Sequence, residues 1–154
     1  MNDIYLNIYN NLIKLTRNKN LYNINKTDTF YDRMIIFFFH LGLLLKVYKN
    51  IEQKDNLQKF FDYCVRQIEL SVREIGYGDA TINKKMKEYV NLLFSIIDNI
   101  DSWETKINYE KKKILNSYIE DMTNDEFFIN YLDKYTNFLL KNSFNKLTKD
   151  ILSF

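Results

Sequence analysis

The stretch MIIFFFHLGLLL, residues 34–45, is an apolar run of twelve positions that is interrupted by His40 and followed by Lys46. A helix that spans a bilayer needs about twenty apolar residues, so this run is too short and predicts a buried core helix. We expect the helix to begin near Asp28 or Thr29 and to end at about Asn50. Because it is apolar on nearly all sides, it should lie at the centre of a bundle.

The rest of the chain shows the same helical character. The 154 residues contain no proline and three glycines, and apolar residues recur at the spacing of one helix face. This spacing predicts further helices over about 3–16, 55–75, 82–97, 102–121 and 127–140. Thr81 is the expected N-cap of the 82–97 helix, and a Thr123–Glu126 capping box is expected before the last one. The sequence therefore predicts an all-α fold, a single domain over 1–154 with about six to seven helices.

Composition limits the possible functions. The 22 basic and 20 acidic residues give a formal charge of +2, far from that of a dedicated nucleic-acid binder, so DNA is not an expected partner. The single cysteine, Cys64, excludes an internal disulfide, and the single histidine excludes a histidine pair for a metal. No cofactor or metal is predicted. An enzyme built around His40, Asp28 and Asp32 is the weakest class, since a second base or ligand is missing.

The second informative stretch is REIGYGDATINKKMKEY, residues 73–89, which holds two of the three glycines. Gly76 follows the apolar stripe of the 55–75 helix, where a residue that tolerates positive φ is favoured. Gly78 predicts a second unusual backbone angle or a close approach by another segment, and Asp79 can accept hydrogen bonds from nearby amides. We expect a stiff, exposed corner.

Three lysines follow this corner in the first turns of the next helix, where cations oppose the helix dipole. Lys84, Lys85 and Lys87, together with Arg73, could receive an anion: an acidic peptide, phospholipid headgroups or an RNA backbone. The alternative is a solvated surface in a lysine-rich protein.

Two stretches, TDTFYDRMIIFFFHLGLLLKVYK (27–49) and SVREIGYGDATINKKMKEYVNLLF (71–94), resemble the ubiquinol–cytochrome c chaperone family of mitochondria and alphaproteobacteria. The family pattern has a Leu-Arg-Glu-Met-Gly-Val-Gly-Asp corner before a basic helix, and an Asp-Thr and an Arg before an apolar helix with a His. The residues that match are Arg73, Glu74, Gly76, Gly78, Asp79, Lys84 and Lys85 at the corner, and Asp28, Thr29, Asp32, Arg33 and His40 upstream. The resemblance covers about residues 4–97.

The resemblance implies a non-enzymatic assembly factor for the cytochrome bc1 complex that binds newly made cytochrome b or another subunit of the complex. It also implies a small helical partner protein and contact with the ribosome or the membrane surface. The expected partner-binding residues are Arg73, Glu74, Gly76, Gly78, Asp79, Lys84, Lys85 and Lys87, with Asp28, Asp32, Arg33 and His40 in supporting roles.

One alternative stays open, a peripheral membrane or RNA-binding helical module that uses the same lysine cluster. The N-terminal residues show no targeting pattern. The expected location is therefore the bacterial cytoplasm, peripheral at the inner membrane face, or the mitochondrial matrix side if a presequence has been removed.

Overall fold

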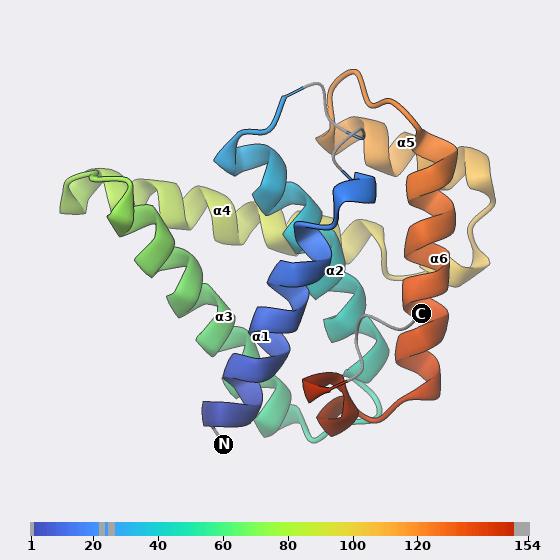
Figure 1. Cartoon of the computed structure of the whole chain (residues 1–154), viewed down its shortest axis with the longest axis horizontal. Helices are drawn as coiled ribbons and strands as arrows, with labels where there is room; N and C mark the ends of the chain where they lie inside the picture. The colour runs from blue at the N-terminus through green and yellow to red at the C-terminus, as the bar shows by residue number, and fades with distance from the viewer. Residues whose placement is uncertain (1, 22–23, 25–26, 150–154) are drawn as a thin grey trace.

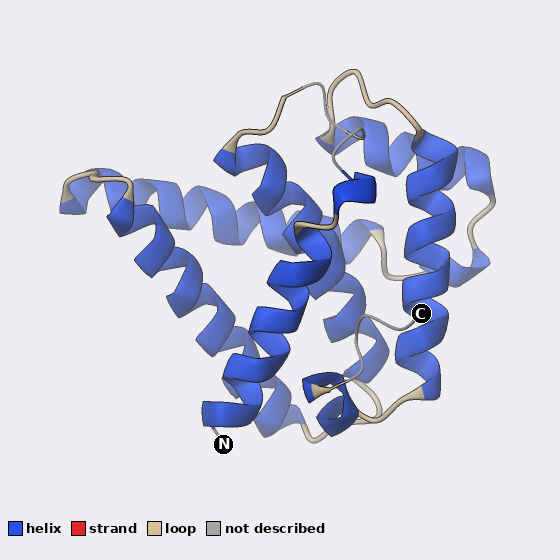
Figure 2. Cartoon of the chain, viewed as in Figure 1, coloured by secondary structure: helices blue, strands red, loops and turns tan. Residues whose placement is uncertain are grey.

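The computed structural model describes residues 2–21, 24 and 27–149 and consists of helices packed around α2 (Figure 1). Its elements are α1 (Asn2–Thr16), η1 (Lys19–Leu21), α2 (Phe30–Tyr48), α3 (Lys54–Glu74), α4 (Asp79–Asn99), η2 (Trp103–Thr105), α5 (Asn108–Tyr118), α6 (Asp125–Lys141) and η3 (Phe144–Thr148), where η marks a 3-10 helix. The described residues contain no strand (Figure 2). The predicted all-α fold is confirmed.

The central helix is α2, as its apolar sequence predicts. Fourteen of its nineteen residues are buried, and it packs against α1, α4 and α6. It begins with a capping box in which the Thr29 hydroxyl accepts from the Asp32 amide and the Asp32 carboxylate accepts from the Thr29 amide. Gly42 lets α4 approach closely, because a Cβ at this position would lie 3.0 Å from Ile100 Cδ1. Among the described residues, no helix has both the length and the hydropathy that crossing a membrane requires.

The two ends of the described chain meet on one side of α2. α1 buries a stripe that contains Ile8 and Leu12, and η3 packs against α1 with Leu147 buried. Asn11 of α1 donates from Nδ2 to the Leu147 carbonyl at 2.8 Å. The hydroxyl of Tyr48, at the end of α2, donates to the Leu139 carbonyl near the end of α6 at a distance of 3.0 Å. These buried hydrogen bonds fix α1, η3 and the end of α6 relative to the central helix.

Two predicted helix starts are wrong. α4 begins at Asp79 with Gly78 as its N-cap, three residues before the expected N-cap, Thr81. The N-cap of α6 is Asn124, in a left-handed conformation and without a side-chain capping bond, so the Thr123–Glu126 capping box is not formed. The reason lies in the tertiary structure, since the Thr123 amide donates to the Ile24 carbonyl of the connection before α2.

The predicted 102–121 helix is divided into η2 and α5. Lys106 and Ile107 have extended backbone angles, which interrupts the helix between the two elements. Trp103 is wholly buried, and its indole Nε1 donates to Asp133 Oδ1 of α6 at 2.9 Å. The interruption allows this large side chain to enter the core and to satisfy its N–H group.

Candidate functional site

α3 and α4 form an arm that extends from the bundle and ends in the corner between them (Figure 1). Each helix has 21 residues, a length of roughly 30 Å at the usual helical rise. Buried Val72 of α3 and Ile82 of α4 lie on the two sides of the corner. We call these two helices the α3–α4 arm, and residues 73–87 the arm tip.

The backbone of the arm tip turns at Gly76, as the sequence predicts. Its φ is +102°, and its amide donates to the Arg73 carbonyl at 3.0 Å. The prediction for Gly78 is wrong. Gly78 has φ −72° and ψ 161°, ordinary extended values, and nothing lies within 4 Å of a Cβ built there. One glycine therefore makes the turn, and the other is an exposed N-cap residue that other side chains could replace.

The charges of the arm tip fall into two groups, of which the first is paired within the chain. The Arg73 guanidinium donates to Asp79 Oδ1 across the corner at 2.9 Å and lies 3.9 Å from a Glu69 carboxylate oxygen. Glu74 is exposed. Arg73 and Asp79 tie the end of α3 to the start of α4, and their contact with a partner stays a prediction. Because the pair is exposed, its contribution to stability is modest.

The second group is the lysines. In the part of the chain that the structure describes, no carboxylate pairs with Lys84, Lys85 or Lys87. Lys84 and Lys87 are exposed, and the Lys85 ammonium lies 4.8 Å from the centre of the Tyr77 ring. Tyr77 is 41% exposed and Ile75 is 49% exposed. The arm tip therefore presents apolar side chains beside cations that are free to meet an anionic group.

The supporting residues at the start of α2 have local structural roles. Arg33 donates two hydrogen bonds of 2.8 Å to the Asp28 carboxylate. Hydrogen bonding to Arg33 lowers the pKa of Asp28. Asp32 belongs to the capping box. These residues hold the N-terminus of α2 in place.

His40 lies in the core, as its apolar neighbours predict. Its Nδ1 lies 2.9 Å from the Ile36 carbonyl and its Nε2 lies 2.7 Å from the Tyr131 hydroxyl. Since a carbonyl can only accept, Nδ1 carries the proton and Tyr131 donates to Nε2. Burial lowers the pKa of His40 to about 4. His40 lies more than two helical turns after Asp32, about 12 Å along α2, and Asp28 precedes the helix, so the three do not form one site.

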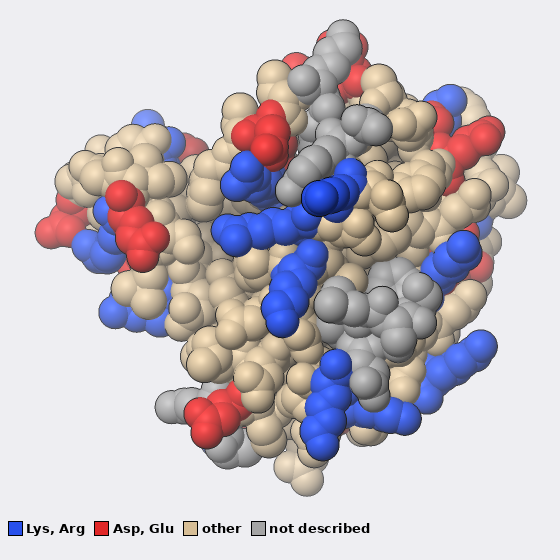
Figure 3. Space-filling view, in the orientation of Figure 1, with Lys and Arg blue, Asp and Glu red and all other residues tan. Residues whose placement is uncertain are grey.

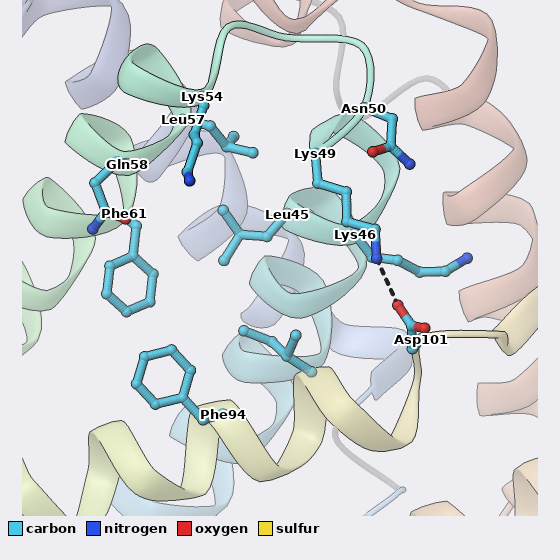
Figure 4. Close-up of a pocket in the computed structure, with 11 residues that line it drawn as sticks. Leu45, Lys46, Lys49, Asn50, Lys54, Leu57, Gln58, Phe61, Phe94 and Asp101 are labelled. Carbon is cyan, nitrogen blue, oxygen red and sulfur yellow. Dashed lines mark hydrogen bonds and ion pairs between the residues drawn. The ribbon is translucent and has the colours of Figure 1, made fainter.

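A groove at the base of the arm was not predicted from the sequence (Figure 4). It has a volume of about 400 Å³ between α2, α3 and α4. Phe61 of α3 and Phe94 of α4 stack across it, with ring centres 5.6 Å apart and planes at 19°. The remaining lining residues are Leu45, Lys46, Lys49, Asn50, Lys54, Leu57, Gln58, Ile97 and Asp101. We call this surface the base groove.

The base groove has an apolar floor and a basic rim. Phe94 is 49% exposed although the opposite side of α4 is packed in the core. On the rim, Lys49 donates to Asp101 Oδ1 at 2.9 Å, and this hydrogen bond lowers the pKa of Asp101. The sequence contains one signal for the base groove. In the Phe60–Phe61 pair only one ring can face the core, and Phe94 lies outside the buried stripe of its helix.

The fold and this site together define a class, an all-α protein with a projecting arm that exposes apolar and cationic side chains. The chain belongs to the ubiquinol–cytochrome c chaperone family, because the model of that family, Ubiquinol-cytochrome C chaperone, matches residues 23–125. The match includes α2, α5 and both helices of the arm. Family membership implies a non-enzymatic chaperone role and a partner in ubiquinol–cytochrome c reductase, the cytochrome bc1 complex.

A solved structure supports the fold. The chain is similar to the Cbp3 homolog from Brucella abortus, with 21% sequence identity and a TM-score of 0.78. The alignment covers 94% of this chain and 84% of the other. No curated protein sequence matches the chain significantly. The structural likeness therefore confirms the arrangement of helices, and the family match carries the role.

Proposed function

We propose that the chain is an assembly factor that holds a newly made subunit of the cytochrome bc1 complex, cytochrome b, through the α3–α4 arm. The observation that supports this most is the combination at the arm tip of exposed Ile75 and Tyr77 with lysines that no carboxylate of the described residues neutralises. A membrane subunit offers apolar segments flanked by charged residues, which are complementary to such a surface.

The residues of the arm tip have different roles in this proposal. Gly76 sets the turn, and the Arg73–Asp79 pair holds the two helices at that turn. Lys84 and Lys85 make the contact. They lie in the second turn of α4 and have no carboxylate partner among the described residues, so they attract acidic groups of the client.

The base groove supplies a second contact along the same arm. The stacked rings of Phe61 and Phe94 leave apolar surface exposed, and Lys54 at the rim can meet a client carboxylate. A client segment that spans from the groove to the arm tip would bury aromatic surface at one end and form ion pairs at the other. Aromatic anchors of this kind contribute most of the energy in many interfaces.

The proposal includes a location and a further partner. A factor that receives cytochrome b acts at the inner membrane face of a bacterium, or at the matrix side in a mitochondrion. A small helical protein could cover part of the arm before the client arrives. Isolation of the chain from membranes tests this, since cytochrome b or a small helical protein should be recovered with it.

Charge reversal at the arm tip tests the proposed contact. The variant with Lys84→Glu and Lys85→Glu should lose client binding by about tenfold or more, because like charges would then face the acidic groups of the client. Cytochrome b and the assembled complex should both decrease in cells, while the melting temperature changes little. The matched control reverses two lysines outside the arm, Lys106→Glu and Lys113→Glu. Normal cytochrome b levels in the arm variant would remove the arm tip from the mechanism.

A further inference from the structure

The charges of the chain are distributed unevenly although its net charge is small. Within residues 2–21 the one carboxylate is Asp3, and residues 134–149 contain none. These two segments lie far apart in the sequence, yet α1, η3 and the second half of α6 form one side of the bundle. Figure 3 shows Lys and Arg gathered on this side, over α1, α6 and η3.

The cations on this side are exposed, and no carboxylate of the described residues pairs with them. They are Lys14, Arg17, Lys19, Lys134, Lys141 and Lys146, which we call the basic face. α6 has three acidic residues, and none of them lines the hollow described below: Asp133 accepts from Lys111 and Trp103, Asp125 pairs with Lys112, and Glu126 is exposed in the first turn. Several lysines on other surfaces are paired, such as Lys112 with Asp125 at 3.0 Å.

A hollow lies within the basic face, between the end of α1, η1 and α6. It has a volume of about 590 Å³, and Lys14 and Lys134 both line it. The amides of Asn18, Asn20 and Asn130 also line it, and no carboxylate does. Hydrogen-bond donors around a cationic hollow suit a phosphate diester with polar substituents, which is the chemistry of a phospholipid headgroup.

Apolar side chains on the same helices favour a lipid surface over a nucleic acid. Phe127 at the edge of the hollow is 44% exposed, and Leu6 on the exposed side of α1 is 41% exposed. Both side chains gain free energy at the boundary between headgroups and acyl chains, whereas the aliphatic Leu6 gains little beside a sugar–phosphate backbone. The Tyr131 ring is not free to stack on a base, because its hydroxyl is bonded to His40 and its ring is stacked on Phe128.

We propose that the basic face docks on an anionic phospholipid bilayer, with a headgroup in the hollow between Lys14 and Lys134. In Figure 1 the arm projects to the left of the bundle, and its tip lies far from α6 and η3, so this docking leaves the arm tip available for a client. The inference is independent of which client the arm holds, and it assigns membrane contact to a surface other than Lys84, Lys85 and Lys87.

Vesicle sedimentation tests the proposal with the whole chain. The protein should sediment with vesicles that contain phosphatidylglycerol and not with vesicles of phosphatidylcholine alone, and binding should weaken from about 0.1 M to about 0.5 M salt. The variant with Lys14→Gln and Lys134→Gln should bind about 25-fold more weakly, roughly fivefold for each lysine. The control with Lys106→Gln and Lys113→Gln removes the same charge and should bind like the unchanged protein.

Three outcomes would overturn the proposal. Equal binding by the Lys14→Gln, Lys134→Gln variant and its control would show that the basic face does not contact lipid. Loss of binding in a Lys84→Gln, Lys85→Gln variant alone would move the membrane contact to the arm tip. Tight retention of a structured RNA, lost in the Lys14→Gln, Lys134→Gln variant and without vesicle binding, would identify RNA as the occupant. Both lysines are exposed, so unchanged melting temperatures should accompany each result.

Discussion

The centre of α2 and the tip of the α3–α4 arm differ in whether their polar side chains are buried and paired or exposed to solvent. At the centre, His40 is wholly buried, and both ring nitrogens have partners at Ile36 and Tyr131. At the arm tip, Lys84 and Lys87 extend into solvent, with no carboxylate partner among the residues described. In the described part of the chain, every buried side-chain nitrogen or oxygen has a hydrogen-bond partner.

This difference separates stability from binding. The buried interior of the body around α2 has its polar groups satisfied and its apolar groups packed, so it has little capacity for a partner. The arm keeps apolar and cationic groups in solvent, where a partner can cover them. Substitutions of buried residues should therefore change the free energy of unfolding, whereas substitutions of exposed side chains on the arm should change binding.

The largest expected effect is the loss of a core ring. Phe39 is wholly buried and makes edge contacts with Tyr118 and Phe128, at 5.9 and 6.2 Å between ring centres. Phe39→Ala should lower the free energy of unfolding by about 3–5 kcal/mol, measured by denaturant titration. The matched change on the arm, Phe94→Ala, should cost less than about 1 kcal/mol, because that ring is 49% exposed. Equal costs would show that the base groove is a structural contact.

The second effect is a pH dependence that originates in the body. Burial lowers the pKa of His40 to about 4, below its ordinary value of 6.5. Below pH 6.5 the unfolded chain binds a proton that the folded chain does not, so stability should fall as pH decreases from 6.5 toward 4. The total loss from this group is about 3 kcal/mol. Unfolding titrations at several pH values measure it, and His40→Gln should flatten the curve between about pH 6.5 and 5. An equally steep curve in that variant would assign the dependence to other groups.

The third effect compares the two glycines of the arm tip. Gly76→Ala should destabilise the chain by about 1–2 kcal/mol, because its φ of +102° strains any residue with a Cβ. Gly78→Ala is the control and should change stability by less than about 0.5 kcal/mol, since its backbone is extended and open space surrounds it. Thermal and denaturant unfolding of both variants would show the difference. Similar losses would mean that Gly78 has a constraint not visible in the fold.

The smallest expected effect is the exposed ion pair of the arm tip. A double-mutant cycle with Arg73→Gln and Asp79→Asn should give a coupling energy below about 1 kcal/mol, because solvent screens the pair. Unfolding at low and high salt measures this coupling, which should decrease as salt rises. A larger coupling that salt does not change would mean that the pair is the main support of the corner.

Much of the candidate site could be predicted because it depends on local sequence. The turn at Gly76 follows directly from the end of an apolar stripe, and the lysines of α4 follow from their positions. The partner of Arg73 could not be predicted, since an arginine near both Asp79 and an unknown client could pair with either. The base groove was missed because Phe61 and Phe94 meet only when α3 and α4 are placed at their actual angle.

The sequence by itself determined the helices, the central position of α2 and the family, because apolar periodicity and short motifs are encoded in neighbouring residues. The tertiary structure alone decided which charges are neutralised and which surfaces remain open. Lys14 and Lys134 share a hollow although 120 positions separate them in the chain. Such proximity follows from how the helices pack, and packing depends on contacts between distant segments that local patterns do not contain.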